Sequence, residues 1–235
     1  MTQHPLQLLD NPVWHALQTT HQHFALGTPA CKRYPATVLP FMGYDPAAPQ
    51  ALNDMAPWMQ PDEKVFIVGD LPPMPASWEV TNQLACLQMV CEHPISRPVK
   101  HPADMVLLSE ADRPEMYALI NLVQPGYFKT DTPSLGDYYG IRQDGKLVAM
   151  AGQRLRLTGC GEISAVCTHP DYTGKGLAQQ LLQHLCYQLS AQGILPFLHV
   201  LASNTRAVGL YEWLGFVTRR DIFFTHVQYH ASTGG

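Results

Sequence analysis

The sequence predicts a mixed α/β fold with a mostly antiparallel sheet and helices on both of its faces. Three patterns in the second half of the chain support this fold class. Strands at 138–143 and 146–156 flank Asp144-Gly145, a pair that tolerates the positive φ of a tight hairpin turn. A third strand is predicted at 162–168. After it, a helix, a strand, a helix and a strand alternate up to residue 227.

The first helix of this alternating part is the clearest element. Its apolar side chains recur at helical spacing and form one face: Leu177, Ala178, Leu181, Leu182, Leu185, Cys186 and Leu189. Gly193 ends it. The strand 194–201 is almost continuously apolar, which predicts burial on both of its faces. Ser203 or Asn204 is then expected to cap a helix that ends at Gly215.

A short strand and a capped helix are predicted upstream of the hairpin. The strand is 105–109, and the helix after it runs to Val123, before Pro125-Gly126. Asp112 is expected to cap this helix, with Glu115 three residues later completing a capping box.

The chain is expected to contain an N-terminal α/β region, residues 1–100, and a main domain, residues 101–235. Proline is dense up to residue 100, and the segment 97–104 has the composition of a linker. Within the first region we predict helices at 11–26 and 46–59, and strands at 37–41, 64–68 and 85–91.

Composition indicates a globular cytoplasmic protein. The 235 residues have a formal net charge of −4, which argues weakly against nucleic acid as the partner. No apolar run reaches membrane-spanning length, and the N-terminus lacks the pattern of a secretory signal. The six cysteines form no CxxC pair and are expected to be reduced thiols. His21 and His23 lack further ligands at metal-site spacing, so we expect no metal.

Two glycines, Gly174 and Gly176, directly precede the predicted helix whose apolar face begins at Leu177. Glycine lets a ligand approach the backbone, and the unpaired amides of a first helical turn attract an anion such as a pyrophosphate. A turn that only connects two elements remains the alternative. The sequence does not match a Walker loop. The position of the first glycine of that motif is His169 here, and the position of its Ser or Thr is Gly176. The dinucleotide fingerprint fails at its third glycine, which is Gln179 here.

The loop Thr173-Gly174-Lys175-Gly176-Leu177-Ala178 resembles the [Gln/Arg]xxGx[Gly/Ala] loop of the GNAT superfamily of acyl-CoA-dependent N-acetyltransferases. Downstream, Asn204, Ala207, Leu210-Tyr211 and Gly215-Phe216 match the NxxAxxLYxxxGF pattern of that family. The resemblance covers about residues 103–227. Thr173 departs from the usual Gln or Arg, so weaker cofactor binding is expected, with Lys175 substituting in part as a point charge.

The resemblance implies acetyl-CoA as the co-substrate, with no metal, and a GNAT fold for the main domain. Residues 1–100 are a candidate for a degenerate second copy of that fold. The pantetheine arm is expected along the strand end and the pyrophosphate on the loop amides. The implied cofactor-binding residues are Val166, Cys167, Thr168, Thr173, Gly174, Lys175, Gly176, Leu177, Ala178 and Asn204.

Two residues are candidates for the proton transfers of a direct attack by a primary amine on the thioester. Glu162, eleven positions before Thr173, is the candidate general base. The alternative is a strand glutamate that faces solvent or pairs with Arg154 or Arg156. Tyr211 is the candidate that protonates the leaving thiolate. The alternative is that Tyr211 only packs in the core, with its hydroxyl hydrogen-bonded there.

The acceptor is expected to be a small-molecule or peptide amine. Tyr127 and Phe128 lie where the family often places the acceptor pocket, although core packing explains them equally well. A rival mechanism would first transfer the acetyl group to the Cys167 thiol. We favour the alternative that this thiol is buried and takes no part in the reaction. A non-catalytic acyl-CoA-binding or sensing module is the alternative function.

Overall fold

The structure is a computed structural model, and it describes residues 5–48, 50–98 and 103–231. Its strands form one 11-stranded sheet in the order β1-β2-β3-β4-β11-β5-β10-β9-β8-β7-β6. The strands are β1 Leu26–Gly27, β2 Cys31–Arg33, β3 Phe41–Tyr44, β4 Lys64–Val68, β5 Trp78–Val90, β6 Met105–Leu107, β7 Tyr138–Gln143, β8 Lys146–Leu157, β9 Cys160–Thr168, β10 Leu195–Leu201 and β11 Val217–Tyr229.

The α-helices are shorter in the N-terminal region than in the rest of the chain. They are α1 Pro5–Leu8, α2 Pro12–Gln18, α3 Arg113–Val123, α4 Leu177–Ala191 and α5 Thr205–Trp213. Five 3-10 turns complete the described elements: η1 Gln22–Phe24, η2 Ala56–Trp58, η3 Glu110–Asp112, η4 Thr132–Leu135 and η5 Pro170–Tyr172.

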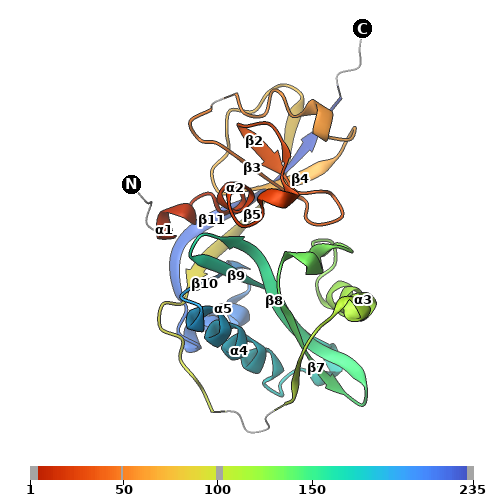
Figure 1. Ribbon diagram of the computed structural model, residues 1–235, viewed down its shortest axis with the longest axis vertical. Coiled ribbons are helices and arrows are strands. Elements are labelled where there is room, and N and C mark those ends of the chain that lie inside the picture. Colours follow the sequence, from red (N-terminus) through yellow and green to blue (C-terminus); the bar gives the residue numbers. More distant parts are fainter. Residues whose placement is uncertain (1–4, 49, 99–102, 232–235) are drawn as a thin grey trace.

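Strand β5 joins the two halves of the chain. It pairs antiparallel with β10 on one side and with β11 on the other, so a strand of the N-terminal region lies inside the C-terminal sheet. On its other side, β11 pairs with β4. In Figure 1 the long β11 and β5 run between the N-terminal strands at the top and the helices α3, α4 and α5 below. The sheet is therefore continuous across residue 100, where the sequence predicts a division into two regions.

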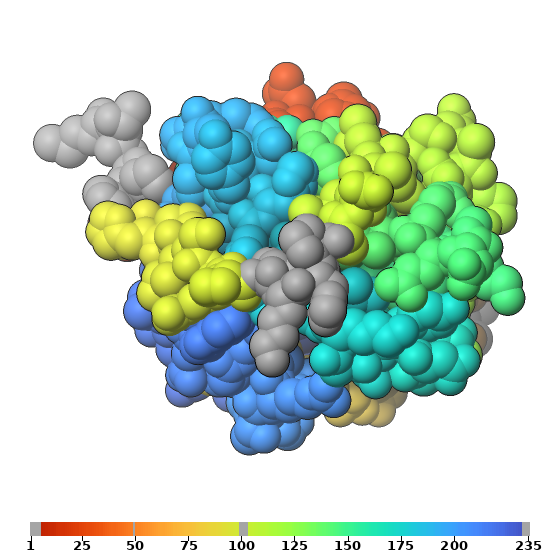
Figure 2. Space-filling view, turned by 90° about the horizontal axis from the view of Figure 1, so that it is seen from below, coloured from red at the N-terminus to blue at the C-terminus, as the bar shows by residue number. Residues whose placement is uncertain are grey.

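Helices cover both faces of the sheet, as predicted. Alternate residues of β8 point to opposite faces: Ala149 and Ala151 pack in the same core cluster as the leucines of α4. Met150 instead packs with Met116, Leu119 and Ile120 of α3. Seen from below, most of the surface belongs to residues after 103, and residues before 98 appear at its side (Figure 2).

The elements after residue 103 agree closely with the sequence. Strand β7 and the end of α3 lie where predicted, and β8 and β11 are longer by one or two residues. The hairpin turn has φ +50° at Asp144 and +77° at Gly145, the conformation that this pair tolerates. Gly193, with φ +69°, follows α4.

Several N-terminal predictions are wrong. Residues 46–59 form turns and the short η2 rather than a helix, although the described residues of this segment bury Ala51, Leu52 and Met55. The predicted strand 37–41 starts at Phe41 instead, because the chain turns at Val38, whose amide donates to the carbonyl of Pro35. The predicted helix 11–26 ends at Gln18, and β5 begins seven residues earlier than the predicted 85–91.

The capping of α3 also differs from the prediction. The reciprocal capping box joins Ser109 and Asp112 at η3, not Asp112 and Glu115. Glu115 instead forms an ion pair with Arg142 at 2.6 Å. In the predicted linker 97–104, residues 99–102 lie outside the described residues. On either side of them, the backbone amides of Arg97 and Ala103 donate to glutamine side chains of α4.

Candidate active site

Strands β9 and β10 pair only at their beginnings and then separate. Their parallel register covers Cys160–Glu162 of β9 and 195–197 of β10. Beyond these residues β8 is the only described strand that pairs with β9, whereas β10 continues beside β5. Ala165 has φ +52° beside a break in the β8–β9 register, which marks a β-bulge with local backbone strain. The bulge bends β9 where the two strands part.

A cavity of about 220 Å³ lies in this opening. One wall comes from β9, β10 and α5, including Ser164, Val166, His199, Asn204 and Tyr211. Further lining residues come from α3 and the loop after it, from the N-terminal region and from other strands of the sheet. They are Ile120, Gln124, Tyr127, Phe128, Thr132, Leu39, Leu84, Cys86, Tyr138, Arg154 and Phe224.

The glycine loop before α4 is open. Gly174 and Gly176 have φ +78° and +72°, and a Cβ built on Gly174 would meet nothing within 4 Å. The amides of residues 174–178 make no hydrogen bond to a described residue. Because α4 starts here and spans 15 residues, its dipole adds to the attraction for an anion. The loop therefore has the open backbone donors that a pyrophosphate needs.

The side chains of this loop are held locally. Thr173 Oγ1 donates to the carbonyl of Pro170 at 3.0 Å. Lys175 Nζ lies 4.6 Å from the centre of the Tyr172 ring, a cation–π distance. The Lys175 charge thus stays at the loop where the sequence expects it to assist an anion.

The structure brings only some of the predicted site residues together. Val166, Asn204, Tyr211, Tyr127 and Phe128 all line the cavity. Glu162, Cys167, Thr168 and the loop residues Thr173, Gly174, Lys175, Gly176, Leu177 and Ala178 are not among its lining residues. The Asn204 side chain caps α5 by accepting from the amide of Ala207.

Glu162 lies in a buried ion pair. Its side chain is 0% exposed, and its carboxylate accepts hydrogen bonds from Arg154 Nε at 2.9 Å and from His199 Nδ1 at 2.7 Å. Burial alone would raise the pKa of Glu162, but the charges and hydrogen bonds of Arg154 and His199 lower it to about 2. The alternative of a pair with Arg154 is therefore present in the structure, and a solvent-facing glutamate is excluded.

His199 is the residue that the sequence reasoning missed. It lies on β10 opposite Gln88 of β5, and its Nε2 lies 3.0 Å from Gln88 Nε2. With Nδ1–H donating to Glu162, Nε2 is left to accept from the Gln88 amide. The signal in the sequence is one histidine inside the apolar strand LPFLHVL, five residues before Asn204.

The contacts of His199 belong to a polar row across the sheet. Arg154, Glu162, His199 and Gln88 come from adjacent strands β8, β9, β10 and β5. Arg219 Nη1 on β11 extends the row by donating to Gln88 Oε1 at 2.7 Å. Each bond fixes the orientation of the next side chain, so the imidazole tautomer is set from both sides.

Tyr211 and Cys167 both have raised pKa values, but only Tyr211 lines the cavity. Burial raises the pKa of Tyr211 to about 12, so its hydroxyl keeps a proton that it can donate into the cavity. Burial raises the pKa of Cys167 to about 12 as well. The Cys167 thiol lies in the core beside Met150 and Phe128, as expected for an inert thiol.

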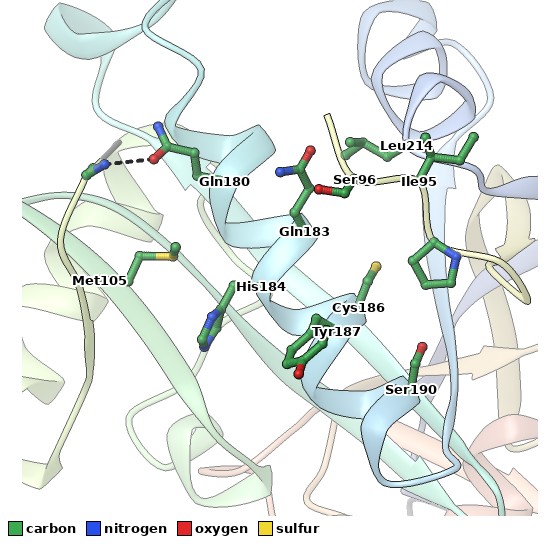
Figure 3. Close-up of a pocket in the computed structure, with 12 residues that line it drawn as sticks. Ile95, Ser96, Met105, Gln180, Gln183, His184, Cys186, Tyr187, Ser190 and Leu214 are labelled. Atoms are coloured by element: carbon green, nitrogen blue, oxygen red, sulfur yellow. Dashed lines mark hydrogen bonds between the residues drawn. The ribbon is translucent and has the colours of Figure 1, made fainter. Parts of the chain in front are cut away.

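A larger cavity of about 660 Å³ lies along the exposed side of α4 (Figure 3). Gln180, Gln183, His184 and Tyr187 border it, with Met105 on one side and Ile95 on the other. The Gln180 and Gln183 side chains already bond the backbone of Ala103 and Arg97. No carboxylate lines this cavity among the described residues, and it shares no lining residue with the cavity in the β9–β10 opening.

Neither a metal site nor a membrane span is found in the described part of the chain. No group of three or more His, Cys, Asp or Glu side chains there is placed to hold a metal ion. None of the described helices has the length and apolar character needed to cross a bilayer.

Comparison with known proteins agrees with this geometry. A crystal structure of a Novosphingobium aromaticivorans protein assigned to the GNAT family is 34% identical to this chain. It superimposes with a TM-score of 0.85, over 97% of this chain and 100% of that one. The chain belongs to the GNAT family. Residues 138–224 of this GNAT protein also match a family model described as FR47-like protein.

More distant relatives share the fold or part of the sequence. A GCN5-related N-acetyltransferase from Kribbella flavida has a TM-score of 0.65 at 17% identity, over 96% of each chain, which shows a common fold. The Escherichia coli K12 protein named ribosomal protein bS18-alanine N-acetyltransferase is 36% identical over 92 residues. That match covers 37% of this GNAT protein and 62% of the length of the curated relative.

Proposed function

We propose that this protein transfers an acetyl group from acetyl-CoA to a primary amine, by direct attack of the amine in a ternary complex. The main support for this proposal is the opening between β9 and β10, which contains a cavity lined by Asn204 and Tyr211. A catalytic role is favoured over a sensing module, because a buried Glu162–His199 pair lies beside this cavity.

The chain offers acetyl-CoA two kinds of contact. The open amides of residues 174–178 and the positive φ of Gly174 and Gly176 suit a pyrophosphate. Beyond Glu162, none of the described strands pairs with the edge of β9 that faces the opening, so the backbone groups of residues 166–168 that point to this edge can bond an extended arm. Acetyl-CoA supplies the activated acyl group, and these residues hold and orient it.

The proton of the attacking amine goes, in this proposal, to His199 rather than directly to Glu162. A carboxylate with a pKa of about 2 that is already held by Arg154 and His199 is a poor proton acceptor. The Nε2 atom of the His199 imidazole carries a lone pair that can accept the proton, and Glu162 would stabilise the resulting imidazolium through Nδ1–H. The accepting atom is Nε2, reached through one water and released from Gln88. Glu162, predicted as the base, becomes the positioning residue.

Tyr211 is the proposed proton donor to the leaving thiolate. It lines the cavity from α5, and its raised pKa keeps the hydroxyl protonated at neutral pH. The raised pKa of Cys167 argues against an acetyl-thiol intermediate, because the thiol and not the thiolate is present at neutral pH.

The names of the relatives support an amine acceptor without identifying the acceptor of this chain. Ribosomal protein alanine is the acceptor that the name of the Escherichia coli relative gives. A peptide amine is therefore one candidate for this chain, and a small-molecule amine is the other. We place the protein in the cytoplasm, where acetyl-CoA and reduced thiols are both present.

The test is calorimetric titration of the purified chain with acetyl-CoA, followed by a free-thiol assay with amines. Gly176→Val places a branched side chain at φ +72° in the loop and should weaken binding by about tenfold or more. Gly145→Val is the matched control, because Gly145 has φ +77° in a hairpin turn away from the site. Equal affinity of both variants, or absence of binding to the wild type, would overturn the proposal.

A further inference from the structure

We propose that the acceptor is a small amine with an apolar body that carries a carbonyl or carboxylate oxygen, bound by Arg154 and Tyr138, as in an amino acid or its amide. This inference rests on the proposed function and identifies the substrate class of the same site.

The size and lining of the cavity limit the body of the acceptor. Its volume of about 220 Å³ is below the range of roughly 300–1,000 Å³ typical of pockets for drug-sized ligands. The acetyl end of the co-substrate needs part of this space. Many of the other lining residues are apolar, among them Leu39, Leu84, Ile120, Phe128 and Phe224. A short apolar amine fits this space better than a folded polypeptide or a sugar.

The charges around the cavity argue against polycationic acceptors. No Asp or Glu is among its lining residues in the described part of the chain. Glu162 is 0% exposed and is already paired with Arg154 and His199. A second ammonium group on the acceptor would therefore find no counter-charge and would face the Arg154 guanidinium.

Arg154 presents one unpaired edge. Its Nε and Nη2 donate to Glu162, whereas Nη1 makes no hydrogen bond to a described residue. The guanidinium carbon lies 4.9 Å from the centre of the Phe41 ring and 5.7 Å from that of Phe224. Two rings and one carboxylate thus fix the orientation of a cavity-lining cation whose third nitrogen remains able to donate.

Tyr138 supplies a second unpaired donor. The residue is 2% exposed and lines the cavity, and its hydroxyl has no hydrogen-bond partner among the residues that the structure describes. Two other buried side-chain atoms without a partner, on Gln153 and His184, belong to residues that do not line this cavity. Leaving a buried hydroxyl unpaired is unfavourable, and a substrate oxygen would satisfy it together with Arg154.

The test measures kcat/KM for leucine, leucinamide and isopentylamine, which share one apolar body, with spermidine and a peptide bearing an N-terminal alanine as further arms. Rates are compared per unprotonated amine. Leucine, leucinamide or both should exceed isopentylamine by about tenfold, the effect of one good hydrogen bond to a charged donor. Leucine against leucinamide separates carboxylate from carbonyl recognition. Preference for isopentylamine, spermidine or the peptide would overturn the inference.

The decisive variant is Tyr138→Phe, which removes only the hydroxyl. It should lower kcat/KM for the preferred oxygen-bearing substrate by about tenfold and for isopentylamine by clearly less. For each substrate, kcat/KM of the variant is divided by kcat/KM of the wild type, so differences in basicity between the substrates do not affect the result. Tyr187→Phe, at a residue that is 69% exposed on α4, is the matched control and should change neither value.

The outcomes separate this inference from the function on which it rests. An equal loss with leucine and isopentylamine in Tyr138→Phe would overturn the role of the hydroxyl. Binding of acetyl-CoA with no transfer to any amine of the panel would overturn the acceptor class. Absence of acetyl-CoA binding would overturn the proposed function itself.

Discussion

Replacing Glu162 by Gln should destabilise the protein strongly. The change keeps the shape of the side chain but removes the charge that balances Arg154, whose side chain is 14% exposed. The glutamine amide also cannot accept all of the hydrogen bonds that Arg154 and His199 donate to the carboxylate. Removing one partner of a buried ion pair typically costs about 3–5 kcal/mol of the free energy of unfolding.

The pKa of Glu162 gives an independent magnitude. The folded protein lowers this pKa from the ordinary value of 4.5 to about 2. That difference corresponds to roughly 3 kcal/mol of stabilisation when the carboxylate is ionised. Because the folded pKa is the lower one, this stabilisation is fully present above pH 4.5 and is lost as the pH falls towards 2.

The assay is urea unfolding followed by tryptophan fluorescence at several pH values. At pH 7, Glu162→Gln should lower the free energy of unfolding by about 3 kcal/mol or more, with a flatter dependence on pH below 4.5. Glu92→Gln, an exposed carboxylate after β5, is the control and should stay within about 0.5 kcal/mol. A double variant with Arg154→Met should lose less than the two single changes together.

The reasoning would be refuted by a small effect. A loss below about 1 kcal/mol at pH 7 would mean that the Glu162 charge is compensated by solvent rather than by Arg154. An unchanged acid dependence in the variant would mean that another carboxylate accounts for it.

Four further predictions follow from the geometry. His199→Asn should lower kcat by about 100-fold while the Kd of acetyl-CoA, by calorimetry, changes little; an unchanged kcat would contradict its proposed role. Tyr211→Phe should lower kcat by about tenfold or more while the Kd of acetyl-CoA, by calorimetry, changes little. Burial lowers the pKa of His21 from 6.5 to about 4, so the free energy of unfolding should fall as the pH drops between these values, and less so in His21→Asn. Iodoacetamide at pH 8 should leave Cys167 unmodified in the native protein, since burial raises its pKa to about 12; rapid alkylation, seen by mass spectrometry, would disprove this.

The second half of the chain could be predicted because its signals are local. Asp144-Gly145 determines a turn by its own backbone preferences, and the apolar spacing of α4 is visible in one segment. The glycine loop is equally local, since positive φ at Gly174 and Gly176 needs no distant partner.

The N-terminal region could not be predicted because its order depends on distant contacts. The apolar residues Ala51, Leu52 and Met55 have a spacing compatible with a helix. In the structure they pack against β4 and β11 from a series of turns, and the prolines at 46 and 57 disfavour a continuous helix. Nothing within 78–90 indicates that this strand pairs with residues more than a hundred positions later.

The residues of the candidate site also differ in whether their positions could be predicted from local sequence signals. Asn204 and Tyr211 belong to one contiguous sequence motif, and both line the cavity. The environment of Glu162 depends on three neighbouring strands, so its burial with His199 became visible only once the strand order was known.

The position of β5 has a consequence for how the chain folds during synthesis. Both of its pairing partners, β10 and β11, are made more than a hundred residues after it. At typical rates of roughly 5–20 residues per second, β5 leaves the ribosome several seconds before its neighbours, with both edges unpaired. The high contact order of this arrangement favours slow folding. The nascent chain should therefore be most prone to aggregation just before β11 is completed, and stops short of residue 217 should leave β4 and β5 with open edges.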